Sequence, residues 1–282
     1  MKEILVVANR TLGGIQLLDA VRAHAAEPGG ARFRLVVPQS TPSAGLVIYD
    51  EAVRESAQVR VDLALSAVAA EGIEATGEVG DADPFLATMD AVAAHRPDEI
   101  IVSTLPAQSS GWLRRDLIER IRNASGLPVE HIVIDLEGEG LSFKVTLVVA
   151  NKTSSGEELI EHLKGLAADG EHLFIAVVPQ ADGTGDAPRE ARARLAKMLD
   201  RLGEEGLLSS GMIGDPDPYT ATRNALELFM VDNVVISTLP DQRSGWMRSN
   251  LIERVAGTTA AKVEHVVVDT QASPTPTVAP SA

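Results

Sequence analysis

The chain has 282 residues, of which 45% are hydrophobic, and it carries a formal net charge of −15. So acidic a surface disfavours nucleic acid and anionic membranes as partners. The absence of cysteine excludes disulfides, thiolate metal sites and cysteine nucleophiles. The length allows two domains of common size, and no apolar run is long enough for a membrane span, so we expect a cytoplasmic protein.

The first half of the chain alternates short apolar runs with segments of helical spacing. The apolar runs predict buried strands at 4–8, 33–37, 73–79, 99–103 and 129–135. The helical segments predict helices over 14–26, 50–71, 84–95 and 112–123, and Asp83 is expected to cap the third of these. Alternation of helices with continuously apolar strands predicts a parallel sheet covered on both faces.

The second half of the chain repeats the first. Gly80-Asp-Ala-Asp-Pro84 recurs as Gly214-Asp-Pro-Asp-Pro218, and Leu117-Ile-Glu-Arg120 recurs as Leu251-Ile-Glu-Arg254. Matches at one constant offset indicate two diverged copies of one domain. We place the copies at residues 1–137 and 143–270, with a short glycine-containing linker between them. The Pro- and Ser-containing segment 271–282 is expected to be a disordered tail.

Three features carry a resemblance to a known family. They are the opening strand Ile4-Leu-Val-Val-Ala8, the Gly80-Asp-Ala-Asp-Pro84 turn, and Leu117-Ile-Glu-Arg120 followed by Leu127-Pro128-Val129. With them, both copies resemble the universal stress protein family over nearly the whole chain. The resemblance implies that each copy is a five-stranded parallel open α/β sandwich (the adenine-nucleotide α-hydrolase-like fold). Because the family's unit pairs, often through strand five, it also implies pairing of the copies about a pseudo-two-fold axis and allows a homodimer of the whole chain.

Members of this family often bind ATP through Gly-x-x-Gly, nine residues and then Gly-Ser or Gly-Thr, after strand four. Here the first two glycine positions hold Ser103 and Pro106 in copy one, and Ser237 and Pro240 in copy two. The Gly-Ser position holds Arg115-Asp116 and Ser249-Asn250. Because proline has no N–H, the family's phosphate-binding loop is absent as such from both copies. Without this loop, ATP or another adenine nucleotide is a candidate ligand that the resemblance alone does not establish.

Two recurring motifs fall after strands one and four, at the sheet edge where such folds bind ligands. One is Asn9-Arg10-Thr11, which recurs as Asn151-Lys152-Thr153. The other is Ser110-Gly111-Trp112-x-Arg114, which recurs as Ser244-Gly245-Trp246-x-Arg248. A capping serine, an open glycine and an arginine fork suit an anion. In the structural alternative the serine only caps a helix, the tryptophan packs and the arginine pairs with a carboxylate.

The predicted ligand-binding residues come from these motifs, the ends of strands two and four, and the turn after strand three. In copy one they are Asn9, Arg10, Thr11, Val37, Gly80, Asp81, Ser103, Thr104, Ser110, Gly111 and Arg114. In copy two they are Asn151, Lys152, Thr153, Val178, Gly214, Asp215, Ser237, Thr238, Ser244, Gly245 and Arg248.

The chain shows no catalytic or metal-binding signature. It has no G-x-S-x-G elbow, no Walker loop and no pair of histidines at ligand spacing. His131 and His265 are expected just ahead of strand five, away from the ligand loops. The sequence thus predicts a stress-associated regulatory binding protein that holds a nucleotide or another small anionic ligand without turnover. The alternative is an interaction scaffold with empty sites, acting through its pseudo-dimer surfaces.

Overall fold

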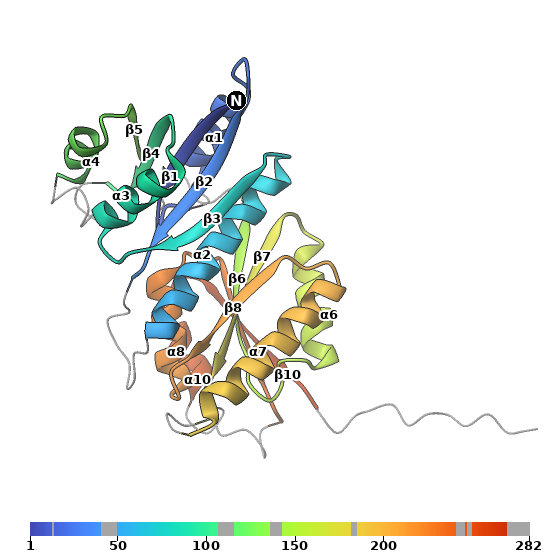
Figure 1. The fold of residues 1–282 in the computed structure, drawn as a ribbon. Coiled ribbons are helices and arrows are strands. Elements are labelled where there is room, and N and C mark those ends of the chain that lie inside the picture. The colour runs from blue at the N-terminus through green and yellow to red at the C-terminus, as the bar shows by residue number, and fades with distance from the viewer. Residues whose placement is uncertain are drawn as a thin grey trace, which may run out of the picture.

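The computed structural model describes residues 1–12, 14–40, 50–106, 116–135, 143–181, 185–240, 246 and 250–269, with the side chains of 50–52 left aside. These residues form two five-stranded sheets, one in each copy, and every strand pairing is parallel. Figure 1 shows the two sheets with helices packed on both faces. The predicted fold class, a tandem pair of parallel α/β sandwiches, is confirmed.

The elements of copy one alternate as the sequence predicts. They are β1 (Lys2–Val7), α1 (Ile15–Ala25), β2 (Ala31–Pro38), α2 (Asp50–Ala70), β3 (Ala75–Gly80), α3 (Pro84–His95), β4 (Glu99–Thr104), α4 (Leu117–Ser125) and β5 (Val129–Val133). The strand order is β3-β2-β1-β4-β5. The order reverses between β1 and β4, so the loops after these two strands lie side by side at the carboxyl edge of the sheet.

Copy two repeats this topology. Its elements are β6 (Lys144–Val149), α6 (Glu157–Ala167), β7 (His172–Pro179), α7 (Ala187–Glu204), β8 (Ser209–Gly214), α8 (Pro218–Leu228), β9 (Asn233–Thr238), α10 (Leu251–Ala256) and β10 (Lys262–Val267). The strand order β10-β9-β6-β7-β8 matches that of copy one, with β6 and β9 in the places of β1 and β4.

Helix boundaries follow local capping chemistry. Asp83 accepts a hydrogen bond from the Phe85 N–H at 2.8 Å, and Asp217 accepts one from Thr220 at 3.0 Å, so α3 begins as predicted. The fourth helix was wrongly expected to begin at residue 112. It begins at Leu117, because Asp116 has the left-handed conformation, with φ of 48°, which a right-handed helix cannot include.

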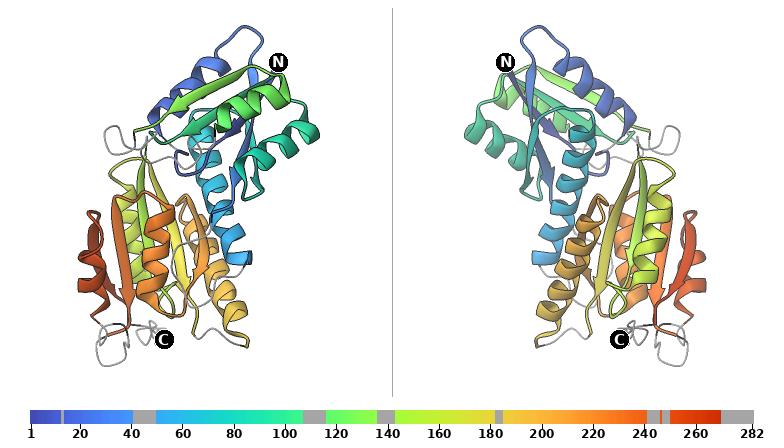
Figure 2. Two further views of the ribbon diagram at one scale, coloured as in Figure 1. Left: turned by 90° about the vertical axis from the view of Figure 1, so that its left-hand side faces the viewer. Right: turned by 90° about the vertical axis from the view of Figure 1, so that its right-hand side faces the viewer.

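Helix α2 packs on both copies. Ala57 and Val61 face the copy-one sheet, whereas Val59 and Leu63 join a core cluster of copy two. Beyond this apolar face, Glu55 accepts from Arg192 at 2.8 Å, and Asp62 accepts from the Ser210 hydroxyl at 2.6 Å. Figure 2 shows α2 running alongside copy two, where it covers β8, an edge strand of that sheet.

The two copies are stacked head to tail. Asn9, Arg10 and Leu12, after β1, share one cavity with Phe143 and Val145 at the start of β6. The carboxyl edge of sheet one therefore faces the amino edge of sheet two, and in Figure 1 β5 and β10 lie far apart. This arrangement differs from the expected pseudo-two-fold pairing through strand five. The apolar face of α2 and the apolar amino edge of sheet two bury each other instead.

Within the part of the chain that the structure describes, no helix combines the length and the apolar character that crossing a membrane requires.

Candidate functional site

Buried threonines tie strand one to strand four in both copies. The Thr11 hydroxyl donates to the Ser103 carbonyl oxygen at 3.3 Å, and the Thr153 hydroxyl donates to that of Ser237 at 3.1 Å. Both threonines are buried, so these bonds hold the loop after the first strand against the end of the fourth. Of the residues that the sequence predicted at this edge, the structure thus places Thr11 against Ser103 and Thr153 against Ser237.

The two recurring asparagines present a fixed acceptor. The amide nitrogen of Asn9 donates to the Pro38 carbonyl at 3.2 Å and to the Ser40 hydroxyl at 2.7 Å. That of Asn151 donates to the Pro179 carbonyl at 3.0 Å. A carbonyl only accepts, so these bonds settle which amide atom is the oxygen. In both side chains this Oδ1 atom is buried and has no hydrogen-bond partner among the described residues.

The recurring serines behave in the same way. The hydroxyls of Ser103 and Ser237 are buried, and neither finds a hydrogen-bond partner in the described ranges. Buried polar atoms are satisfied in the great majority of cases, so each exception needs an explanation. Here the same two atoms, an asparagine Oδ1 and a serine Oγ, lack a partner among the described residues at the same edge of both copies. In each copy these atoms are one acceptor and one hydroxyl, which can donate or accept.

The turn after strand three has structural reasons to recur. A Cβ atom at Gly80 would lie 2.7 Å from the Ala87 Cβ, and one at Gly214 would lie 2.6 Å from that of Ala221. Glycine is therefore needed where the third helix of each copy approaches the sheet. The Asp81 carboxylate accepts from the Asp83 N–H at 2.8 Å, as Asp215 does from Asp217 at 2.9 Å. Val37 and Val178 are buried strand residues.

A threonine–histidine pair at the end of strand four was missed. His131 lies within β5, opposite Val102, and its Nε2 is 2.9 Å from the Thr104 hydroxyl. His265 and Thr238 make the same contact at 2.8 Å in copy two. The expectation that these histidines precede strand five was therefore wrong. Burial, with the nearby Arg122, lowers the pKa of His131, which favours the neutral ring.

Alternation along β5 could have revealed this pair. Thr104 and Thr238 each precede a histidine by 27 residues, and the strand register puts both histidines beside the carboxyl end of strand four. Each histidine thus fixes the orientation of a threonine hydroxyl at the carboxyl end of the fourth strand of its copy.

The second recurring motif lies mostly beyond the described ranges. Ser110, Gly111 and Arg114, and likewise Ser244, Gly245 and Arg248, fall outside the residues that the structure describes. Trp246 is described and is partly buried against the copy-two core, as its packing role predicts. The loops end at Asp116 and Asn250, whose φ values of 48° and 49° are left-handed. These two residues stand at the second position of the expected Gly-Ser pair, in a conformation that Asp and Asn tolerate better than most residues.

The cationic positions beside the asparagines are solvent-facing. Arg10 and Lys152 are both exposed, one next to each asparagine. Long exposed cations at this position suit an anionic group that extends from the site toward solvent.

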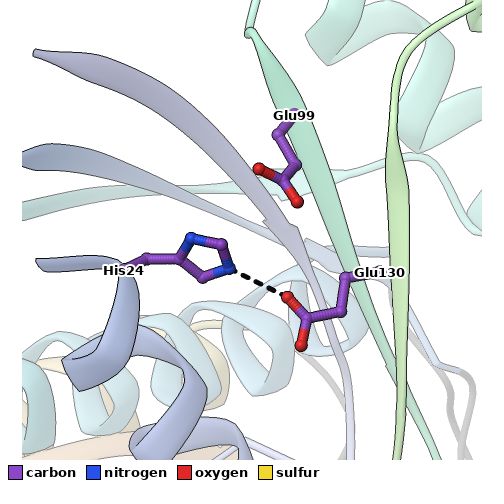
Figure 3. A group of neighbouring side chains, drawn as sticks. All are labelled: His24, Glu99 and Glu130. Carbon is purple, nitrogen blue, oxygen red and sulfur yellow. Dashed lines mark hydrogen bonds and ion pairs between the residues drawn. The ribbon is translucent and has the colours of Figure 1, made fainter. Parts of the chain in front are cut away.

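A different group of side chains lies at the amino edge of sheet one. Figure 3 shows His24 pointing toward Glu130 with Glu99 nearby, and the His24 Nε2 is 2.9 Å from the Glu130 carboxylate. The potential ligand atoms of these three residues lie within 4.8 Å of one another. The Lys2 ammonium, however, is 2.6 Å from Glu99 and already supplies a cation there. The group is accounted for as a set of ion pairs that join α1 to β1, β4 and β5.

Comparisons with known proteins give matches only at the level of structure. No family model matches the chain, and neither does any curated protein. A universal stress protein from Archaeoglobus fulgidus DSM 4304 is 15% identical, with a TM-score of 0.35, and the match covers 96% of this chain and 97% of the other. Another from Archaeoglobus fulgidus is 15% identical, with a TM-score of 0.36, over 45% of this chain and 99% of the other.

A functionally unknown protein from Pseudomonas aeruginosa PAO1 is 17% identical, with a TM-score of 0.32, and the match covers 95% of this chain and 93% of the other. The fold itself is established by the strand order and by the parallel pairing of both sheets. With two such sheets in tandem, the chain has the fold expected of the universal stress proteins that its sequence resembles.

Proposed function

We propose that this chain is a stress-associated binding protein of the universal stress protein type, which holds a small polar ligand at the carboxyl edge of its sheets without converting it. One observation carries the proposal. In each copy an asparagine Oδ1 and a serine Oγ are buried and unpartnered, as far as the described residues extend, at the edge where strands one and four end. Satisfying buried polar atoms with a ligand recovers free energy that the unliganded site lacks.

The chemistry of these atoms restricts the ligand. The asparagine oxygen accepts, so the ligand presents an N–H or O–H group to it, while the serine hydroxyl can donate or accept. The exposed cation beside each asparagine, Arg10 or Lys152, suits a negative group on the solvent side. Adenine nucleotides combine an amine, hydroxyls and phosphate in one molecule, and they are the ligand class that fits best.

A thermal-unfolding screen tests the proposal directly. The full chain, freed of co-purified ligand, is heated with ATP, ADP, AMP, a cyclic nucleotide or phosphate, with and without Mg²⁺. A ligand at 100 times its dissociation constant should add about 2.7 kcal/mol to the free energy of unfolding. We expect such an increase with at least one nucleotide, and no increase with any of them would contradict the proposal.

The Ser237→Ala variant separates a ligand contact from a structural role. It removes a buried hydroxyl that has no partner in the described chain, so the unliganded protein should keep or raise its melting temperature. Its nucleotide-induced shift should shrink. Ser103→Ala makes the same change in copy one, so the pair reports which copy binds. A drop in unliganded stability with an unchanged ligand shift would identify the hydroxyls as structural.

The scaffold alternative is favoured by a different observation. β5 and β10 are edge strands, and each leaves a valine largely exposed: Val133 at 47% and Val267 at 44%. An exposed apolar edge strand is a ready surface for pairing with another chain. On this alternative the chain forms a homodimer through one of these edges.

Light scattering coupled to size exclusion measures that pairing. If the scaffold alternative holds, the wild-type chain elutes as a dimer, and Val267→Lys or Val133→Lys yields monomers, because a lysine on an edge strand opposes pairing. A wild-type chain that remains monomeric at high concentration would rule out self-pairing through these two edges.

A further inference from the structure

Arg60 of helix α2 is a buried cation that has no counter-charge among the residues the structure describes. Only 3% of its surface is exposed. All three guanidinium nitrogens lack a hydrogen-bond partner in the described part of the chain. Its guanidinium group lies over an aromatic ring, with Cζ 5.7 Å from the centre of the Phe229 ring. A buried charge is costly unless it is paired and hydrogen-bonded, so this arginine requires an explanation.

The side chain lines a cavity between the two copies. The cavity measures about 30 Å³, and its walls include Asn9, Arg10 and Arg60 from copy one and Phe143 and Phe229 from copy two. On this measure a single water needs about 10–15 Å³, so the space holds roughly two water-sized groups. Two arginines, Arg60 buried and Arg10 exposed, therefore line one small, partly open cavity in a chain whose net charge is −15.

Neighbouring acids on α2 are engaged elsewhere. Glu55 is 2.8 Å from Arg192 and 3.4 Å from the Ile213 N–H, and Asp62 accepts from Ser210 at 2.6 Å. Arg10 is the charge that acts on Arg60: burial, and after it the repulsion from Arg10, lower the pKa of Arg60 to about 10. Both effects would be relieved by an anion placed between the two guanidinium groups.

In copy two the arginine at the equivalent helix position pairs with a carboxylate of its own helix. Alignment of the helix ends, Ala70 with Glu204, pairs Arg60 with Arg194. Arg194 lies 2.9 Å from Glu190, one turn earlier in α7. Copy one has Ser56 in the place of Glu190, and its hydroxyl donates to the Val53 carbonyl at 2.8 Å. Helix α2 of copy one thus lacks the carboxylate that pairs with the equivalent arginine of α7, and Arg60 lines a cavity instead.

We propose that Arg60 and Arg10 bind one compact monovalent anion, a halide or the carboxylate of a small acid, in the cavity between the two copies. The guanidinium group offers several donors in a planar fork, and this geometry suits such an anion. Because the cavity walls come from both copies, the anion also joins the carboxyl edge of copy one to the amino edge of copy two. The site goes beyond the nucleotide function proposed above: it shares Arg10 with the ligand edge of copy one, but it adds the buried Arg60, and the ligand edge of copy two contains neither arginine.

Anion-dependent thermal unfolding of the full chain tests this site. The protein is dialysed into a bulky sulfonate buffer, too large for the cavity, and ionic strength is kept constant with the same sulfonate. Sodium chloride, sodium formate or sodium sulfate is then titrated in. We expect chloride or formate to raise the melting temperature along a single-site saturation curve, and the more effective of the two identifies the class of occupant. Sulfate should give no saturating rise.

Arg60→Met is the decisive variant. It should remove the saturating anion response and leave the melting temperature in sulfonate equal to or above that of the wild type, because an unpaired buried charge has been removed. Arg194→Met is the matched control, and it should keep the response. Arg10→Met changes an exposed side chain, so the variant should fold like the wild type. It should weaken the apparent anion affinity several-fold.

Three results would overturn the proposal. They are an anion response that survives Arg60→Met, equal loss of the response in Arg194→Met, and no response in the wild type. In the last case, destabilisation by Glu137→Gln or Glu139→Gln would show that a linker carboxylate of the chain itself occupies the position. Nucleotide binding that still depends on Ser237 but not on Arg60 would leave the proposed function intact, so the two ideas fail separately.

Discussion

Replacing Phe174 by alanine is expected to lower the free energy of unfolding of copy two by about 3–5 kcal/mol, the range for phenylalanine lost from a well-packed core. Phe174 is the third residue of β7 and has none of its surface exposed, and it packs with the α6 and α7 residues of the same cluster. Its ring also stacks on His172, with centroids 4.7 Å apart. Chemical denaturation followed by circular dichroism measures the change.

Phe33→Ala is the matched control for this prediction. Phe33 occupies the equivalent position in β2, but it borders a cavity of about 20 Å³ shared with Leu17, Leu18 and Val21. Space beside the side chain allows neighbours to move in after truncation, which reduces the cost. The loss at Phe33 should therefore be smaller than that at Phe174. Equal losses would show that the cavity gives copy one no additional freedom to relax.

Replacing Leu63 by alanine is expected to cost about 2–5 kcal/mol and to loosen copy two rather than its own copy. Leu63 is buried, together with Val59, among residues of copy two that include Met212, Leu228 and Phe229. Truncation opens a cavity between the copies, while the face of α2 on sheet one is untouched. Hydrogen exchange should accelerate in β8 and α8 while β1 and β2 keep their protection.

Val61→Ala, two residues earlier on the same helix, should give the opposite pattern. Val61 is buried against Val37 and Ala57 of copy one. Its truncation should accelerate exchange in β2 and β3 and leave β8 nearly unchanged. If both variants loosened the same copy, the division of α2 into two packing faces would be wrong.

The strands were predictable because buried parallel strands are continuous apolar runs. The run at 99–103 became β4 (Glu99–Thr104), and that at 33–37 became the centre of β2 (Ala31–Pro38). The start of α4 was not predictable in this way. A capping serine at Ser110 suggested an early helix, whereas the left-handed backbone at Asp116 delays it to Leu117.

The site was predictable only as far as the two copies agree. Asparagine, threonine and serine recur in both, and the structure places them together at one edge. Arg60 was missed because no motif around it recurs in the second copy. Its counterpart Arg194 forms an ordinary i,i+4 ion pair with Glu190, and only the stacking of the copies shows that Arg60 is buried at their interface. Comparison of the two copies reveals residues that both share, but not residues such as Arg60 whose surroundings differ between them.

Stacking a carboxyl edge on an amino edge joins two different surfaces, and contacts of that kind can add units without limit, as in a filament. The apolar surface of copy two that contacts copy one includes Phe143, Phe229 and Met230. At the equivalent positions copy one has Met1, His95 and Arg96, and His95 is 2.9 Å from Glu78. The amino edge of copy one therefore offers a further unit no comparable apolar contact surface. Polymerisation by repetition of this contact is thus opposed at the exposed edge of copy one.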